Sequence, residues 1–198
     1  MQTEQKIYSI VPDVIANKYQ DDKQVVRFYF SFSCQYCKRV HNFIRTWGQS
    51  LPSGMRYIET PVISNTPSSK MLAYAYEFVK ANAKTDYYVE KYTTNIYKHI
   101  HKIQNTDELS RLIKEAMDAS KINTDAFMKR LRTNEFLDYM KTINEQQIAY
   151  AIDRTPSIVI GNKYITHLEY VKGDTSKFIE LINAVTNIHL MDGDNINE

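Results

Sequence analysis

The stretch of sequence that decides the fold is Val25-Val26-Arg27-Phe28-Tyr29-Phe30-Ser31-Phe32-Ser33-Cys34-Gln35-Tyr36-Cys37. The β-branched and aromatic residues of Val25–Phe32 predict a buried strand, and Cys37–Trp47 has the apolar spacing of a helix that stops at Gly48. Cys34 therefore falls at a helix N-terminus, where unpaired backbone N–H groups and the positive end of the helix dipole favour a thiolate. A thiolate attacks disulfides, and Cys37 can resolve the mixed disulfide that results. The order strand, CxxC, helix thus indicates thiol–disulfide exchange.

The cysteine pair has two other interpretations. With His41, one helical turn after Cys37, it offers three zinc ligands, but a structural zinc site uses four and the chain contains no further cysteine. The remaining histidines show no ligand-like spacing to the pair: His99, His101, His167 and His189. A lone CxxC is a weak signal, so an inert disulfide also stays open. Redox chemistry is the interpretation that we favour.

Size and composition narrow the classes of protein. At 198 residues the chain can bury a substantial core, as one large domain or as a domain with an inserted subdomain. The net charge is +2 and the basic residues are dispersed among acidic ones, which argues against a nucleic-acid-binding surface. No apolar stretch approaches the ~20 residues of a transmembrane helix, so none is predicted.

The N-terminal residues leave the compartment open. Residues 1–6 lack the apolar core of a signal peptide. Either the protein is cytosolic, or it is an exported protein whose signal peptide has been replaced by an initiating methionine. A single cysteine pair is compatible with both, because an exported oxidant with one catalytic pair avoids mispairing itself.

The first two-thirds of the chain contain further strands and then a helical region. Ile7–Val11 and Met55–Thr60 predict two strands, and residues 64–152 switch to the helical period. The helices expected there begin near Thr66, ahead of Val89, and near Thr106, Asn123 and Thr133. We interpret their apolar stripes as core, with no cofactor implied.

After residue 152 the strand signal returns. The expected elements are a strand within Thr155–Ile160, a turn at Gly161-Asn162, a second hairpin strand within Lys163–Thr166, a helix over Ser176–Ile188 and a frayed tail over Asp192–Glu198.

Pro156 stands at the first position of its strand, where a proline is sterically allowed, and that alone can explain it. The other interpretation is a cis Thr155–Pro156 bond beside the CxxC, although only ~5% of X–Pro bonds are cis. The order of the elements favours the second interpretation. We expect a set of parallel strands with the CxxC at one end and the start of the Pro156 strand beside it, so that Thr155 lies within van der Waals reach of Cys34.

These elements in this order resemble the DsbA family of bacterial thiol:disulfide oxidoreductases. The similar segments are Phe30-Ser31-Phe32 before the CxxC, Thr155-Pro156 before an apolar strand, Gly161-Asn162-Lys163-Tyr164 in the hairpin, and Gly173-Asp174-Thr175-Ser176 before the last helix. The resemblance implies an α/β protein, with a thioredoxin-like fold and an inserted all-helical subdomain. The implied domains are 1–63 with 153–191 for the thioredoxin-like domain, 64–152 for the helical domain, and 192–198 for a tail.

The resemblance also implies roles for individual residues. Cys34 would be the exposed nucleophile that carries the mixed disulfide, and Cys37 the buried resolving thiol. The start of the proline strand would pair with an extended substrate chain through backbone hydrogen bonds, as in strand addition. The residues implied in substrate binding are Gln35, Tyr36, Thr155 and Pro156.

The partners are likewise implied by the family. The substrates would be unfolded or partly folded proteins, and a membrane quinone-linked protein similar to DsbB would reoxidise the cysteine pair. The resemblance implies a monomer in the periplasm, without a metal or a cofactor.

Two departures from the family concern the chemistry of the pair. Gln35-Tyr36 stands where the family type has proline and histidine, and the neutral Tyr36 brings no cationic charge to the nucleophile. Phe28 stands where the family often has a buried acidic residue, so any proton relay for the resolving thiol runs through other groups or water. Glu59 on the next strand is a candidate, although we expect it to be a salt-bridged surface residue.

Three functions compete. The leading hypothesis is an oxidase that donates its Cys34–Cys37 disulfide to folding exported proteins. The nearest alternative is a disulfide reductase or isomerase on the same scaffold. An alternative from another class is a non-catalytic chaperone that binds peptides on the Thr155-Pro156 surface and has an idle CxxC.

Overall fold

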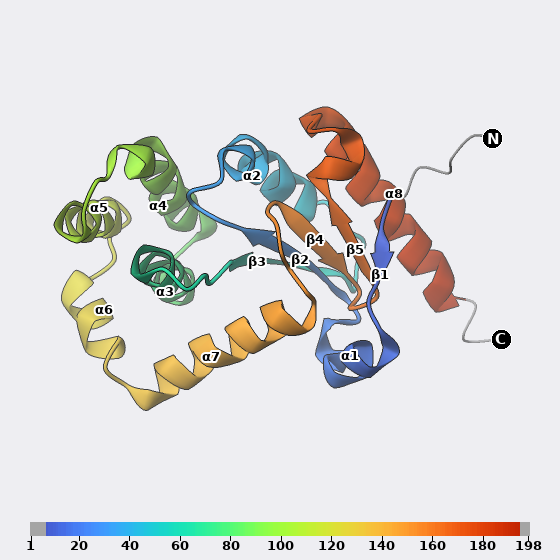
Figure 1. Cartoon of the computed structure of the whole chain (residues 1–198), viewed down its shortest axis with the longest axis horizontal. Coiled ribbons are helices and arrows are strands. Elements are labelled where there is room, and N and C mark those ends of the chain that lie inside the picture. Colours follow the sequence, from blue (N-terminus) through green and yellow to red (C-terminus); the bar gives the residue numbers. More distant parts are fainter. Residues whose placement is uncertain (1–6, 195–198) are drawn as a thin grey trace. The chain divides into compact units, whose positions relative to one another are not determined.

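The chain divides into two compact units, of which the computed structural model describes residues 7–194. The first unit contains the sheet and comprises the segments up to Phe30, Cys34–Thr60 and Ala149 onward; the second comprises Ser31–Ser33 and Pro61–Ile148 (Figure 1). Residues 31–33 and 61–63 thus belong to the helical unit and 149–152 to the sheet unit, in contrast to the expected boundaries. Phe32 explains part of this difference, because its ring packs 5.1 Å from the ring of Tyr97 in the helical unit.

Within residues 7–194, the strands form one five-stranded sheet in the order β1-β5-β4-β2-β3. Their bounds are Ser9–Ile10 (β1), Val25–Phe30 (β2), Arg56–Pro61 (β3), Ser157–Ile160 (β4) and Tyr164–His167 (β5). The strand predicted over Val25–Phe32 therefore ends two residues early. Strands β2 and β4 are central, which explains their nearly continuous apolar sequence: every residue of the two except Arg27 is buried.

Strands β2 and β4 run antiparallel, so the predicted parallel arrangement is wrong for this pair. Tyr29, near the end of β2, is paired with Ser157 at the start of β4. In a parallel pair the start of β4 would lie beside the start of β2, roughly 15–20 Å from the CxxC. The antiparallel register is therefore what brings the proline segment to the cysteine end of β2.

The helices of the sheet unit are α1 (Asp13–Lys18), α2 (Gln35–Gly48) and α8 (Thr175–Asp194), with short 3-10 turns η1 (Gln20–Asp22) and η3 (Leu168–Val171). Helices α2 and α8 contact each other and the sheet (Figure 1). The last residue of α2 is Gly48, as expected near a helix stop. A Cβ at this position would lie 2.4 Å from the ring of Tyr57, so only glycine fits against that ring.

Helix α8 continues to Asp194, so the expected fraying is wrong for the first residues of the tail, and residues 195–198 lie outside the described part of the chain. Asp192 accepts a hydrogen bond from Lys163 Nζ at 2.6 Å and another from the hydroxyl of Tyr164. The polar composition suggested fraying, but these two contacts connect the acidic end of α8 to the β4–β5 hairpin.

Gly161 in that hairpin should tolerate no side chain. Its φ is +59°, and a Cβ would lie 2.0 Å from the ring of His189, whose Nε2 lies 2.8 Å from the carbonyl oxygen of Lys23. Gly161→Ala should lower the free energy of unfolding by about 2–3 kcal/mol, measured by urea denaturation.

Gly54→Ala is the matched control, because Gly54 has φ +93° and nothing within 4 Å of a Cβ. It should cost only the ~1–2 kcal/mol of a left-handed backbone. In a His189→Ala background the cost of Gly161→Ala should fall to the same level. Equal costs for the two glycines in the unmodified chain would show that the ring of His189 does not restrict Gly161.

In the helical unit, the helices between residues 61 and 149 are α3 (Pro67–Asn82), α4 (Asp86–His99), α5 (Thr106–Ala119), α6 (Thr124–Arg130) and α7 (Asn134–Ala149), with a 3-10 turn η2 at Ile100–Lys102. The starts expected near Thr66, Thr106 and Asn123 are confirmed by side-chain caps, in which Thr66, Asn105 and Asn123 accept backbone N–H groups at 3.2, 2.9 and 3.0 Å. Between residues 7 and 194, no helix has the length and apolar character needed to cross a membrane.

Candidate active site

Cys34 is the N-cap residue of α2, so the predicted position at a helix N-terminus is confirmed. Its Sγ accepts the backbone N–H of Cys37 at 3.3 Å, and its carbonyl accepts the N–H of Lys38 at 3.1 Å. Cys34 is partly exposed, whereas Cys37 is fully buried. The sulfur of another molecule can therefore reach Cys34 but not Cys37.

Thr155 and Pro156 lie beside Cys34, although 121 residues separate Cys34 from Thr155 in the sequence. The Cys34 thiol donates to the carbonyl oxygen of Thr155 at 3.3 Å, and the Thr155–Pro156 peptide bond is cis. The next residue, Ser157, is buried, and its hydroxyl donates to the carbonyl of Arg154 at 2.6 Å. This bond fixes the turn that presents Thr155 to the sulfur.

The surroundings of Cys34 stabilise its thiolate. A hydrogen bond from the Cys37 side chain is the largest influence and burial opposes it, whereas the Thr155 side chain and the backbone N–H groups of Cys37 and Tyr36 add to it. Together these groups lower the pKa of Cys34 to about 5. The contact with the Thr155 carbonyl belongs to the protonated thiol, so it is given up on ionisation. At neutral pH the reduced chain therefore carries a thiolate, which is both the attacking form and a good leaving group.

Gln35 and Tyr36 are exposed in the first turn of α2, and the Arg39 guanidinium lies 5.7 Å from the centre of the Tyr36 ring. Tyr36, Thr155 and Pro156 line one cavity of about 310 Å³. Its other polar lining residues are Arg154, His167, Glu169 and Lys172. Sequence reasoning missed these four, because they precede β4 or lie at or beyond the end of β5, and no spacing connects them to the cysteines.

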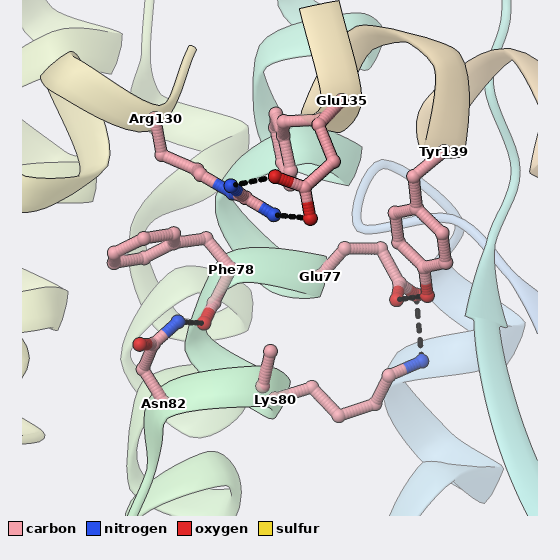
Figure 2. Close-up of a pocket in the computed structure, with 9 residues that line it drawn as sticks. Glu77, Phe78, Lys80, Asn82, Arg130, Glu135 and Tyr139 are labelled. Carbon is pink, nitrogen blue, oxygen red and sulfur yellow. Dashed lines mark hydrogen bonds and ion pairs between the residues drawn. The ribbon is translucent and has the colours of Figure 1, made fainter. Parts of the chain in front are cut away.

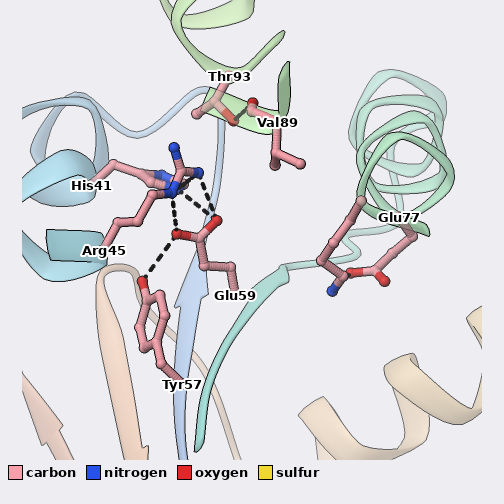
Figure 3. Close-up of polar contacts among 8 residues, drawn as sticks. His41, Arg45, Tyr57, Glu59, Glu77, Val89 and Thr93 are labelled. Carbon is pink, nitrogen blue, oxygen red and sulfur yellow. Dashed lines mark hydrogen bonds and ion pairs between the residues drawn. The ribbon is translucent and has the colours of Figure 1, made fainter. Parts of the chain in front are cut away.

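Glu59 on β3 is buried rather than on the surface, which corrects the expectation, but it is salt-bridged as expected. Figure 3 shows the Arg45 guanidinium and the His41 ring directed at its carboxylate. Arg45 Nε lies 2.8 Å from Oε1 and Arg45 Nη2 lies 2.7 Å from Oε2, and Tyr57 donates its hydroxyl to Oε1 at 3.2 Å. Burial raises the pKa of Glu59, but His41 and Arg45 outweigh this and hold it below its usual range. A carboxylate held ionised in this way is a poor proton acceptor, which argues against a relay through Glu59.

His41, the third candidate zinc ligand, has other partners. Its Nε2 lies 3.2 Å from Arg45 Nη2 and 3.3 Å from Glu59 Oε2, and its ring stands edge-on to Phe30 and Phe28. Burial is the main cause that lowers its pKa, so the imidazole is neutral at pH 7. In the part of the chain from residue 7 to 194, no group of three or more His, Cys, Asp or Glu side chains could hold a metal ion.

A larger cavity, of about 690 Å³, lies in the helical unit between α3 and the α6–α7 segment (Figure 2). Its charges are matched: Glu77 pairs with Lys80 at 2.7 Å and accepts the Tyr139 hydroxyl at 2.8 Å, and Arg130 binds Glu135 through two hydrogen bonds. The cavity contains no cysteine. The side chains that can do redox chemistry are thus confined to the start of α2.

Comparisons with known proteins agree with this geometry. A family model described as thioredoxin matches residues 19–180. Among solved structures, NmDsbA1 of N. meningitidis is 17% identical with a TM-score of 0.70, over 97% of this chain and 96% of that one. Pseudomonas aeruginosa DsbA is 14% identical with a TM-score of 0.73, over 91% and 89%. A variant of Proteus mirabilis DsbA, solved with the non-covalently bound peptide PWATCDS, is 16% identical with a TM-score of 0.72, over 96% and 99%. The chain belongs to the thioredoxin family and has the fold of the DsbA oxidoreductases.

Proposed function

We propose that this chain is a protein-disulfide oxidase that transfers its Cys34–Cys37 disulfide to unfolded or partly folded exported proteins. The observation that carries the proposal is the position of the Cys34 sulfur, which caps α2 and accepts the backbone N–H of Cys37 at 3.3 Å. A sulfur in this place is stabilised as the thiolate product of the reaction, so the disulfide form is the oxidant.

The reaction proceeds in two exchanges. A client thiolate attacks Cys34 Sγ, the Cys34–Cys37 bond breaks, and Cys37 leaves as a thiolate that takes up a proton. A second client thiolate then attacks the client sulfur of the mixed disulfide, and Cys34 leaves as its stabilised thiolate. The client has lost two electrons, and this chain has gained them. A quinone-linked membrane partner similar to DsbB would remove those electrons and restore the disulfide.

Four residues are proposed to hold the client during these exchanges: Gln35, Tyr36, Thr155 and Pro156. The backbone of the Thr155-Pro156 segment would pair with an extended client chain by strand addition. The bound peptide of the Proteus mirabilis DsbA structure supports this kind of substrate. We further propose a monomer located in the periplasm.

A titration of Cys34 tests the proposal. The ultraviolet absorbance of the thiolate should show a midpoint near pH 5 in the reduced protein. In Cys37→Ala the midpoint should rise, because the largest stabilising hydrogen bond is lost, yet stay below the ordinary value because backbone N–H groups remain. A midpoint near the ~8.5 of a free cysteine would overturn the oxidase assignment.

Equilibration with glutathione buffers separates the related alternatives. The reduction potential of an oxidase should lie nearer to that of DsbA, about −120 mV, than to that of thioredoxin, about −270 mV. A thioredoxin-like value would identify a reductase. An unreactive pair would identify the peptide-binding chaperone with an idle CxxC.

A further inference from the structure

The cavity beside Thr155 and Pro156 is bordered by charges that are not all neutralised. Arg154 is fully engaged, because its guanidinium binds Asp153 at 2.9 and 3.0 Å and also contacts Glu169. Lys172 lines the same cavity, yet within residues 7–194 it has no ion-pair partner. An ammonium group without a counter-charge thus borders the cavity.

Tyr36 connects this lysine to the active-site dipeptide. A Cβ at Gly173, the residue after Lys172, would lie 3.5 Å from Cε1 of Tyr36, so the turn packs directly on the tyrosine ring. The Arg39 guanidinium lies 5.7 Å from the centre of the same ring, and it too has no salt-bridge partner in the described part of the chain. Tyr36, the side chain between the cysteines, therefore shares its cavity with Lys172 and contacts Arg39, and neither cation has a salt-bridge partner among the described residues.

The backbone at Lys172 is also unusual. Its φ is +54° and its ψ is 33°, the left-handed conformation, which costs a non-glycine residue about 1–2 kcal/mol. Glycine would occupy this position without that cost, and glycine does follow at Gly173, where φ is +80°. Lys172 carries its side chain despite this cost, and strained non-glycine residues cluster at ligand-binding sites.

We infer that Lys172, assisted by Arg39, is a specificity-determining residue that binds a carboxylate of the client. The inference rests on the proposed function. An extended client that pairs with the Thr155 backbone advances about 3.3 Å per residue. A Glu or Asp close in sequence to the client cysteine would therefore reach the Lys172 ammonium while the mixed disulfide exists. Clients with an acidic residue near the cysteine should react faster than basic ones, because the attraction is absent or reversed for the latter.

Three synthetic peptides test this inference. Each peptide carries one cysteine, and the three sequences are identical except at the position two residues from that cysteine. This position is Glu in the first peptide, Gln in the second and Lys in the third. The rate at which each peptide forms a mixed disulfide with the oxidised protein is followed by stopped flow at low salt. The Glu peptide should react about three- to tenfold faster than the Lys peptide, and added salt should reduce the ratio.

Variants of the lysine make the test specific. Lys172→Gln should bring the ratio close to one, Lys172→Arg should restore it, and Lys172→Glu should reverse the preference. Lys177→Gln is the matched control, since Lys177 is an exposed lysine of α8 that does not line the cavity, and it should leave the ratio unchanged. An unchanged ratio in Lys172→Gln, or an equal loss in Lys177→Gln, would overturn the inference. Three peptides that react equally fast would overturn it while leaving the oxidase intact, whereas peptides that do not react at all would contradict the proposed function itself.

Discussion

The free energy of unfolding of the reduced protein, relative to that of the oxidised protein, should increase as the pH rises from about 5 towards about 8.5. The pKa of Cys34 is lower in the folded chain than in the unfolded chain. The contribution of Cys34 to the stability of the reduced protein is therefore complete above the pKa that Cys34 has in the unfolded chain. It is lost as the pH falls through the pKa that Cys34 has in the folded chain. The disulfide form has no corresponding group. At pH 7 the displaced pKa corresponds to ~2–3 kcal/mol, which solvent around the partly exposed sulfur reduces to ~1–2 kcal/mol.

The bridge itself opposes this effect by a comparable amount, because closing its short loop constrains the unfolded chain by about 2 kcal/mol, so the balance depends on pH. We expect the reduced form to be the more stable one at about pH 8 and to lose this advantage at about pH 5. Denaturant unfolding of both redox forms across this range measures the difference. The Cys34→Ser variant has neither the thiolate nor the bridge, so its own free energy of unfolding should show no such rise with pH. An oxidised form that is more stable by ~2–4 kcal/mol at every pH would indicate an ordinary structural bridge.

Glu59→Gln should lower the free energy of unfolding by about 3–5 kcal/mol. The substitution keeps the shape of the side chain but removes the negative charge that compensates the buried guanidinium of Arg45. A buried cation that loses its counter-charge is costly, because it has already given up its hydration. Urea denaturation of the reduced protein at pH 7 measures the loss.

An exposed pair of the same chemistry provides the control. Arg130 binds Glu135 with two hydrogen bonds of 2.7 and 2.8 Å, but both side chains are solvent-accessible. Glu135→Gln should cost no more than about 1 kcal/mol. The double variant Arg45→Met with Glu59→Leu should be more stable than Glu59→Gln, because neither charge then remains buried. If Glu59→Gln costs no more than Glu135→Gln, the buried pair contributes nothing beyond a surface pair.

The local part of the site was predictable from the sequence, because it depends on residues a few positions apart. The cap at Cys34 needs only the N–H of Cys37, and the cap at Thr66 needs only that of Ser69. Helix geometry fixes such contacts once the helix starts. The apolar run of β2 was equally clear, since a strand buried on both faces needs no alternation.

The remainder of the site depends on which segments meet in space, and periodicity does not encode that. The direction of β4 depends on pairing within the whole sheet, and the parallel arrangement assumed for β2 and β4 was wrong. A glutamate in a strand is ordinarily exposed, so the burial of Glu59 follows only once Arg45 is known to bind both of its oxygens. The position of Lys172 beside Tyr36 likewise requires the fold.

The hydrogen bond from Cys34 to Thr155 also links activity to the schedule of protein synthesis. Thr155 follows Cys34 by 121 positions, and a segment of this length takes about 6 to 24 seconds to translate at the usual rates. For most of that interval the growing chain already contains both cysteines and the whole of α2, but the Thr155-Pro156 segment proposed to dock a client has not been made. Under the proposed function, selective oxidation of a client can therefore begin only after the Thr155-Pro156 segment has been made.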